Sequence, residues 1–259
     1  MPNVAGTILS RPFTDTGMTE RKRAALVTGA ASGIGRATVE RFSTNDEYDI
    51  VVGFDVDDSI EDIDGVEGHV VDVSDYNAVA NAVIAIEEHA DITSLVACAA
   101  VSRYAWIGDL APEEWDKLLD VNLKGQYTVA RAVSTRMYER NEGTIVTVSS
   151  GAGQRGSVSA GVHYSASKAG IFGLTKGLAK QLAPHVRVNC IVPGLIDTPL
   201  TFDSGLWTED DIKAFADDLP LERLGSADEV ARVIEFLSGN GSAYMTGSIV
   251  NVDGGGALS

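Results

Sequence analysis

The sequence lacks the segments that would carry it into or across a membrane. It contains no run of about twenty consecutive apolar residues, the length that a membrane-spanning helix needs. Before the basic cluster at residues 21–23, the N-terminal region carries one positive charge, Arg11, and no apolar core of signal-peptide length. We therefore expect a cytoplasmic protein with no membrane partner.

Cysteine and histidine are also scarce. The only two cysteines, Cys98 and Cys190, lie in apolar, strand-like runs, which favours buried free thiols in a reducing cytoplasm over a disulfide. The four histidines are scattered singly along the chain, so the sequence predicts no metal site.

Basic residues are few for a chain of this size. Lysine and arginine together number 20 against 37 aspartates and glutamates, which gives a formal net charge of −17. Such a protein repels the phosphates of nucleic acids and of anionic lipids, so neither is an expected partner. The acidic composition suits a halophilic source or a high-GC organism, and it does not separate the two.

From Arg23 onward, apolar runs alternate with amphipathic stretches, as is typical of a parallel sheet covered by helices on both faces. We predict one doubly wound, Rossmann-type α/β domain with a seven-stranded parallel sheet over 23–259, after a flexible arm over 1–22. Residues 195–222 break the alternation and are predicted to form a lid. The predicted strands lie near 24–28, 49–54, 68–71, 93–98, 143–149, 186–191 and 247–251, and the helices near 33–44, 75–89, 112–140, 162–182 and 227–238.

Tyr164 and Lys168 are the residues around which the chemistry of the chain is organised. They lie four positions apart in a helix-favouring stretch and so share one face of the helix. A nearby cation favours the phenolate of a group whose pKa is ordinarily about 10, so we expect Lys168 to make Tyr164 an acid/base group for alcohols and carbonyls. Taken alone, the same spacing also fits a solvated helix face.

A glycine-rich turn follows the first predicted strand. Gly29, Gly33 and Gly35 permit a tight turn there, and the helix that follows offers N–H groups to a pyrophosphate. Asp55 comes twenty residues after Gly35, at the end of the second apolar run, and can accept hydrogen bonds from both hydroxyls of an adenosine ribose. A purely structural turn is the alternative.

These motifs resemble the short-chain dehydrogenase/reductase family in its compact form of about 250 residues. The resemblance covers roughly residues 22–258, and its remaining motifs occur in the family's order: Asp72-Val73, Val121-Asn122, Val148-Ser149-Ser150, Asn189 with Pro193-Gly194, and Thr246-Gly247 with Val252-Asp253-Gly254-Gly255.

The resemblance implies a role for each matching residue. Tyr164 would be the general acid/base, and Lys168 would lower its pKa and bind the nicotinamide ribose. Ser150 would hold the substrate oxygen, and Asn122 would anchor a water in the proton relay, although outside the family they also fit a strand-end hydroxyl and a helix-packing amide. The expected cofactor contacts are Gly29, Ser32, Gly33, Ile34, Asp55, Asp72, Val73, Cys98, Ala99, Tyr164, Lys168, Pro193, Ile196 and Thr198.

Two features depart from the family pattern. Residues 97–100 read Ala-Cys-Ala-Ala where the family usually has Asn-Asn-Ala-Gly, so we expect a modified cofactor floor. Ser150 lies fourteen residues before Tyr164, one more than the commonest interval, and we place the extra residue in a loop from Gln154 to Val162. By family analogy the substrate pocket lies near Tyr104, Trp106, Gln154, Arg155, His163, Leu200, Phe202 and Trp207, most of which also fit core or lid packing.

The resemblance implies an oxidoreductase that transfers a hydride between NAD and a secondary alcohol (a polyol, sugar or cyclic alcohol) or its ketone. Asp55 favours NAD over NADP because no arginine follows it and Ser32 stands where NADP-preferring relatives often carry a base. Arg36 is the one nearby cation, and it would permit some NADP binding if its side chain turned toward the ribose. An NADPH-dependent reductase resembling 3-oxoacyl carrier-protein reductases is the alternative within the enzyme class. A nucleotide-binding protein of the same fold without catalysis is the alternative outside it. We also expect a homotetramer paired through the helices near 112–140 and 162–182.

Overall fold

The chain is built on a parallel sheet of seven strands in the order β3-β2-β1-β4-β5-β6-β9, seen in a computed structural model that describes residues 21–202 and 208–258. Neighbouring strands are parallel throughout. The strands are β1 (Lys22–Thr28), β2 (Ile50–Asp55), β3 (Glu67–Val70), β4 (Ala90–Ala97), β5 (Thr144–Val148), β6 (Arg187–Pro193) and β9 (Ile249–Val252). The predicted doubly wound α/β fold is confirmed.

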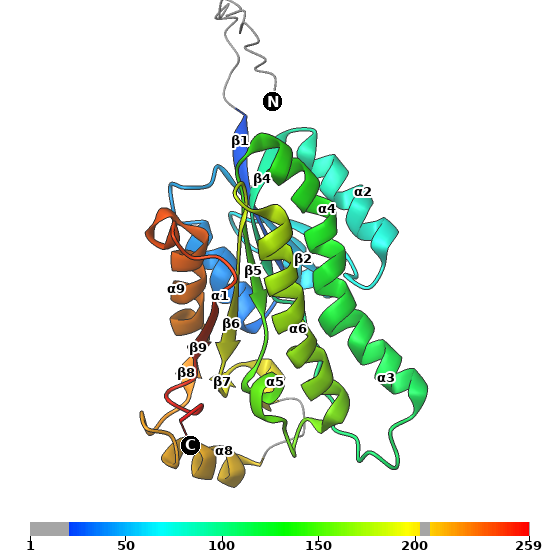
Figure 1. The fold of residues 1–259 in the computed structure, drawn as a ribbon, viewed down its shortest axis with the longest axis vertical. Coiled ribbons are helices and arrows are strands. Elements are labelled where there is room, and N and C mark those ends of the chain that lie inside the picture. Colours follow the sequence, from blue (N-terminus) through cyan, green and yellow to red (C-terminus); the bar gives the residue numbers. More distant parts are fainter. Residues whose placement is uncertain (1–20, 203–207, 259) are drawn as a thin grey trace, which may run out of the picture.

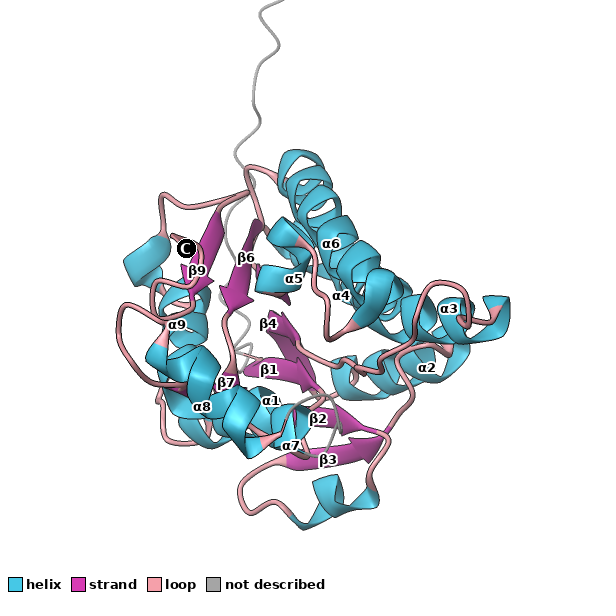
Figure 2. Cartoon of the chain, turned by 90° about the horizontal axis from the view of Figure 1, so that it is seen from below, coloured by secondary structure: helices cyan, strands magenta, loops and turns pink. Residues whose placement is uncertain are grey.

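Helices cover both faces of this sheet (Figures 1 and 2). One face carries α1 (Gly33–Phe42) and α9 (Ala227–Ser238), and the other carries α2 (Tyr76–Glu87), α4 (Gly125–Arg140) and α6 (Gly161–Leu182). Successive residues of β1 point to opposite faces, so Leu26 packs in the core beside α2 and α4, whereas Val27 packs in the core beside α1 and α9. The buried part of β1, residues 24–28, is therefore an almost continuous apolar run, whereas Lys22 and Arg23 at its start are exposed.

The carboxyl ends of the strands meet at one edge of the sheet, where the functional loops gather (Figure 1, lower half). This edge carries the helices α5 (Gly151–Arg155), α7 (Pro199–Phe202) and α8 (Glu209–Asp217) and a small two-stranded sheet of β7 (Ile196–Asp197) and β8 (Gly225–Ser226). In open α/β sheets this is the edge at which ligands bind.

The helix predicted over 112–140 is divided into three parts. They are α3 (Pro112–Leu119), a π-helical turn (Asp120–Lys124) and α4. The helix α5 and two short 3₁₀ helices, Asp58–Asp62 and Asn240–Ser242, were not predicted, because segments of five residues or fewer carry no helical periodicity.

Most of the arm predicted over 1–22 lies outside the described residues. The two residues that are described belong to the folded unit, since Arg21 pairs with Asp91 at 2.8 Å and Lys22 begins β1. The predicted lid over 195–222 contains β7, α7 and α8, and residues 203–207 within it lie outside the described part.

The two cysteines are free thiols, as predicted, but their settings differ. Cys190 is buried in β6, whereas Cys98 follows the end of β4 and is half-buried. Of the helices that the structure describes, none combines the length and the apolar composition needed to cross a membrane.

Candidate active site

A cleft of about 1110 Å³ opens at the carboxyl edge of the sheet, between the glycine-rich turn and the start of α6. Its walls include every residue that the sequence predicts for catalysis or cofactor binding except Asn122. Segments far apart in the chain meet there because the parallel strands all end at this edge.

The turn from β1 to α1 is shaped by its glycines. Gly29 and Gly33 have φ of +68° and +53°, a left-handed conformation that favours glycine. A Cβ on Gly35 would overlap the carbonyl oxygen of Gly29, so the first turn of α1 packs directly on the glycine-rich turn. Ser32, the N-cap of α1, makes no capping hydrogen bond with its side chain. The free N–H groups of this helix end suit a pyrophosphate.

Asp55 ends β2 and is held in place by main-chain N–H groups. One carboxylate oxygen accepts from Ala31 N at 2.9 Å, and the other accepts from Val56 N at 2.8 Å and Asp57 N at 3.1 Å. Arg36, the nearest predicted cation, is bound to Glu40 at 2.6 Å. These residues fit a dinucleotide whose adenosine ribose lies against a fixed, unneutralised carboxylate.

Three further predicted contacts surround this end of the cleft. Asp72 accepts from Ser74 N and Ser74 Oγ at 2.8 and 2.7 Å, so its carboxylate fixes the turn that leads from β3 to α2. Val73 is buried in the core. Thr198 is also buried, and its side chain lies 3.3 Å from where a Cβ on Gly33 would be, so it closes the cleft over the glycine-rich turn.

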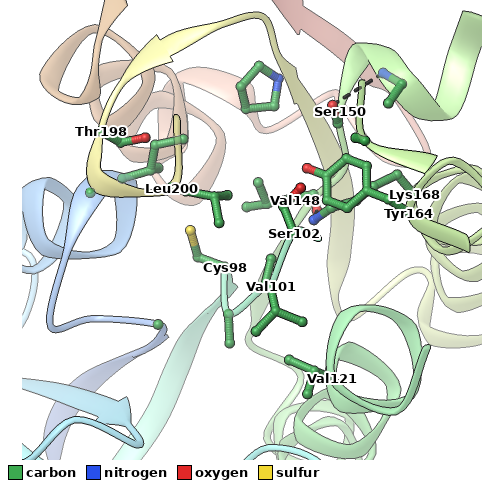
Figure 3. A pocket seen from close by; sticks show the side chains of 18 of the residues that line it. Cys98, Val101, Ser102, Val121, Val148, Ser150, Tyr164, Lys168, Thr198 and Leu200 are labelled. Carbon is green, nitrogen blue, oxygen red and sulfur yellow. Dashed lines mark hydrogen bonds between the residues drawn. The ribbon is translucent and has the colours of Figure 1, made fainter. Parts of the chain in front are cut away.

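The segment that departs from the family pattern, residues 97–100, is anchored by Thr28. The Thr28 hydroxyl oxygen accepts from both Cys98 N and Ala99 N at 3.1 Å, and a Cβ on Gly29 would lie 2.8 Å from Ala99 Cα. The main chain below the cleft is therefore held by a side chain of β1. Cys98 directs its sulfur into the cleft (Figure 3), and burial raises the pKa of this thiol to about 11.

Tyr164, Lys168 and Ser150 lie together on one side of the cleft, across from Thr198 and Leu200 (Figure 3). The first two occupy one face of α6, and the Lys168 ammonium lies 5.7 Å from the centre of the Tyr164 ring. Lys168 Nζ donates to Val148 O at 3.1 Å, and Ser149 Oγ donates to Lys168 O at 2.7 Å, so the end of β5 positions the lysine. Ser150 accepts from Ala152 N at 3.2 Å and begins α5.

The pKa of Tyr164 is shifted in the direction opposite to the prediction. Burial raises the pKa of Tyr164, and the hydrogen bond with Ser150 opposes this rise. Burial also lowers the pKa of Lys168 to about 8. Both shifts disfavour the charged form, because a charged group removed from water loses its hydration. The sequence alone does not show how deeply the two side chains are buried.

Asn122 lies behind the cleft wall, in the π-helical turn, and is fully buried. Its Oδ1 accepts from Val101 N at 2.8 Å, and its Nδ2 donates to Val101 O at 2.9 Å and to Ser167 Oγ at 3.3 Å. The side chain therefore ties the π-helical turn to the loop after β4 and to α6. The predicted water anchor does not line the cleft.

The predicted substrate pocket is only partly correct. Arg155, His163 and Leu200 line the cleft, whereas Tyr104, Trp106, Gln154 and Phe202 do not. Tyr104, Trp106 and Phe202 are exposed to solvent. Gln154 turns away from the cleft, and its Nε2 donates to Asn251 Oδ1 at 3.0 Å. Trp207 lies outside the described residues. Arg103, which was not predicted, lines the cleft from the loop after β4.

His163 is buried beside Tyr164, with 1% of its surface exposed. Burial lowers the pKa of His163, while Glu114 opposes the shift, so the imidazole is neutral near pH 7. Its Nδ1 has no hydrogen-bond partner among the described residues.

Comparison with known proteins is consistent with this geometry. A family described as Enoyl-(Acyl carrier protein) reductase matches residues 29–256. The chain is 36% identical over 241 residues to the 3-oxoacyl-(acyl-carrier-protein) reductase FabG of Thermotoga maritima, covering 89% of this chain and 96% of the relative.

Two solved structures are similar along nearly their whole length. The aldohexose dehydrogenase of Thermoplasma acidophilum superposes with a TM-score of 0.83 at 30% identity, covering 92% of this chain and 95% of the other. A 3-oxoacyl-(acyl-carrier protein) reductase of Brucella melitensis superposes with a TM-score of 0.80 at 32% identity, covering 91% of each chain.

Proposed function

The chain belongs to the short-chain dehydrogenase/reductase family, and from this membership we propose that it transfers a hydride between NAD and a secondary alcohol or the corresponding ketone. The observation that carries the proposal is the grouping of Tyr164, Lys168 and Ser150 beside a cleft that also holds the glycine-rich turn. A bound nicotinamide supplies the hydride acceptor or donor. The residues of the chain supply orientation and the proton transfer.

In the direction of alcohol oxidation, Tyr164 takes the proton of the substrate hydroxyl as the C–H hydride leaves the carbinol carbon. Ser150 hydrogen-bonds the same oxygen and keeps it within reach of the phenol. Lys168, fixed by Val148 O, would bind the nicotinamide ribose of the cofactor. Reduction of a ketone is the reverse, and it starts from the neutral phenol that burial favours.

Asp55 supports NAD as the cofactor. Its carboxylate is held by three main-chain N–H groups and has no ion-pair partner among the described residues, so the 2′-phosphate of NADP would face an uncompensated negative charge. We assign Gly29, Ser32, Gly33, Ile34, Asp72, Val73, Cys98, Ala99, Pro193, Ile196 and Thr198 to the same cofactor, all of which line the cleft.

A polyol, a sugar or a cyclic alcohol is the proposed substrate. The name of the Thermoplasma relative, an aldohexose dehydrogenase, supports this class, as do the polar walls of the cleft around His163. Oxidation is the proposed cellular direction, and the proposed assembly is a homotetramer.

A second candidate, an NADPH-dependent ketoreductase acting on carrier-bound 3-oxoacyl groups, is favoured by the name of the Thermotoga relative. The net charge of −17 opposes it, since an acidic carrier would be repelled. NADPH-dependent reduction of a 3-oxoacyl thioester, with no NAD-dependent oxidation of alcohols, would establish this candidate instead.

The substitution Tyr164→Phe tests the proposed chemistry. It removes the proton-transferring hydroxyl but leaves the other cofactor contacts, so we expect turnover to fall by at least a thousandfold. NADH binding, measured by fluorescence titration, should change less than threefold. Turnover near the wild-type level would show that Tyr164 is not the acid/base group.

A further inference from the structure

The charges along the cleft are sorted by sign. Asp55 ends β2 and Asp72 follows β3, on one side of the central strand β1. On the other side, the loop after β4, helix α3 and helix α5 contribute Arg103, Lys117 and Arg155 to the lining, and the single acid that these segments contribute among the described residues is Glu114. This cationic end belongs to a protein with 37 acidic residues and only 20 basic ones.

Most of the described arginines have a carboxylate partner, and the two at this end do not. Arg131 and Arg187 also lack one, but they lie outside the cleft and are bound instead by Tyr127 and by main-chain carbonyl groups. Elsewhere in the described chain, eight arginines pair with a carboxylate, as Arg41 does with Asp228 and Glu235. Arg103 has neither a hydrogen bond nor an ion pair with any described residue, and Arg155 has no carboxylate partner among them. With acids so abundant, two guanidinium groups left without carboxylates in one cleft suggest that the ligand brings the anion.

Arg155 is held close to the proposed reaction centre. Its Nη1 donates to Gly256 O, and its Nη2 lies 3.1 Å from where a Cβ on Gly151 would be. Gly151 directly follows Ser150, so the guanidinium folds back over the start of α5 toward the serine. The bond to Gly256 restrains the side chain, while Nε and Nη2 remain without partners among the described residues.

From these observations we propose that the alcohol substrate carries an anionic group, a carboxylate or a phosphate, which Arg103 and Arg155 bind at the Ser150 end of the cleft. This proposal rests on the proposed function and narrows the substrate class to hydroxy acids or phosphorylated polyols. Lys117 adds charge at the mouth of the cleft, and the neutral His163 adds a polar wall.

Steady-state kinetics with matched substrate pairs test the proposal. The pairs are 3-hydroxybutyrate with 3-hydroxybutyramide, gluconate with sorbitol, and sorbitol 6-phosphate with sorbitol, each measured with NAD. We expect at least one anionic member to exceed its neutral partner tenfold in kcat/KM, about 1.4 kcal/mol, mostly through KM. The carboxylate and phosphate pairs distinguish the two kinds of anion.

Arg103→Gln should reduce this preference at least tenfold, because the KM of the anionic member should rise far more than that of its neutral partner or of NAD. Arg155→Lys retains the charge but loses the planar donor pair, and it should raise the KM of the anionic member alone. Lys22→Gln, which changes the net charge equally at the opposite edge of the sheet, is the control and should match the wild type. The proposal would be overturned if Arg103→Gln raised the KM for NAD instead, or if it lowered kcat/KM equally for both members of a pair.

Binding separates this inference from the proposed function. In the presence of NAD, malonate or inorganic phosphate should raise the melting temperature saturably. The apparent dissociation constant of the anion should be at least tenfold higher for Arg103→Gln than for Lys22→Gln. If the enzyme oxidises none of these alcohols with NAD, the proposed function is contradicted. The melting curves then test anion binding by themselves. Equal anion responses in Arg103→Gln and Lys22→Gln would refute the anion site whatever the kinetics show.

Discussion

Lys168 is a buried cation whose burial lowers its pKa to about 8. An unfolded lysine has a pKa of about 10.4, so between pH 8 and 10.4 the unfolded chain binds more protons than the folded one. The contribution of Lys168 to the free energy of unfolding therefore rises with pH across that window and is lowest below pH 8. Such a group is retained at a cost in stability, as expected for a residue kept for function.

Lys168→Met should therefore make the protein more stable at pH 7 while abolishing turnover. We expect a gain on the order of 2 kcal/mol in the free energy of unfolding, which shrinks toward zero as the pH approaches 10. Urea unfolding of the wild type and of Lys168→Met at pH 7 and pH 9.5 measures this gain. The contributions of the other titrating groups are the same in both proteins and cancel in the difference. Lys180→Met, at an exposed position of α6, is the control and should show no such pH dependence.

Asp55 decides the cofactor in the proposed function. We expect the wild type to prefer NAD over NADP about a hundredfold in kcat/KM, about 2.8 kcal/mol. Asp55→Asn should weaken the binding of NAD and bring the kcat/KM values for the two cofactors within tenfold of each other, because the repulsion of the 2′-phosphate is removed. Asp58→Asn loses the same charge outside the cleft and should keep the preference. Equal kcat/KM for both cofactors in the wild type would contradict the role of Asp55.

At the scale of single residues, the sequence predicts which groups gather but not their electrostatics. Motif spacing identifies Tyr164, Lys168, Ser150 and Asp55, and the structure places all four along the cleft. The pKa of Tyr164 was predicted in the wrong direction because desolvation depends on the surrounding packing. Arg103 lies in a loop without periodicity, so only the fold reveals that it faces the cleft.

The π-helical turn is the element that the sequence conceals. An apolar pattern over 112–140 predicts one helix, whereas the structure widens the helix at Asp120–Lys124. The wider turn buries Asn122, and its amide satisfies both main-chain groups of Val101. The strands, by contrast, are predicted to within about three residues, because most of them are short apolar runs bounded by polar residues.

Asn122→Leu tests the importance of this connection. Val101 N and Val101 O would lose their partner, and the Asn122 site itself is fully buried. The loss of hydrogen bonds at a buried site costs about 1–3 kcal/mol each. We expect the free energy of unfolding to fall by about 2–4 kcal/mol and hydrogen exchange to quicken in residues 98–103. Asn77→Leu on the exposed face of α2 is the matched substitution and should change stability by less than about 0.5 kcal/mol. Similar unfolding curves for both variants would show that Asn122 has no structural role.

For the whole molecule, the net charge of −17 opposes the proposed assembly. Apolar side chains on the long helices favour pairing, since Tyr127 and Tyr138 of α4 and Val162 of α6 each expose at least 40% of their surface. Close approach of several chains brings their excess negative charges together. The balance between these terms is set by salt, which screens exposed charges over about 8–10 Å at physiological ionic strength.

We therefore expect the homotetramer to strengthen as salt rises from 0.02 to 1 M, roughly a change in screening length from 20 to 3 Å. Light scattering across a dilution series should show the midpoint of dissociation falling at least tenfold in protein concentration. Tyr127→Glu adds charge to the proposed interface and should favour the monomer at low salt. Ile84→Glu adds the same charge on the exposed face of α2 and should leave the midpoint close to that of the wild type. A monomer at both ionic strengths would contradict pairing through α4 and α6, whereas a tetramer that weakens with salt would mean that attraction between charges, rather than apolar contact, holds the chains together.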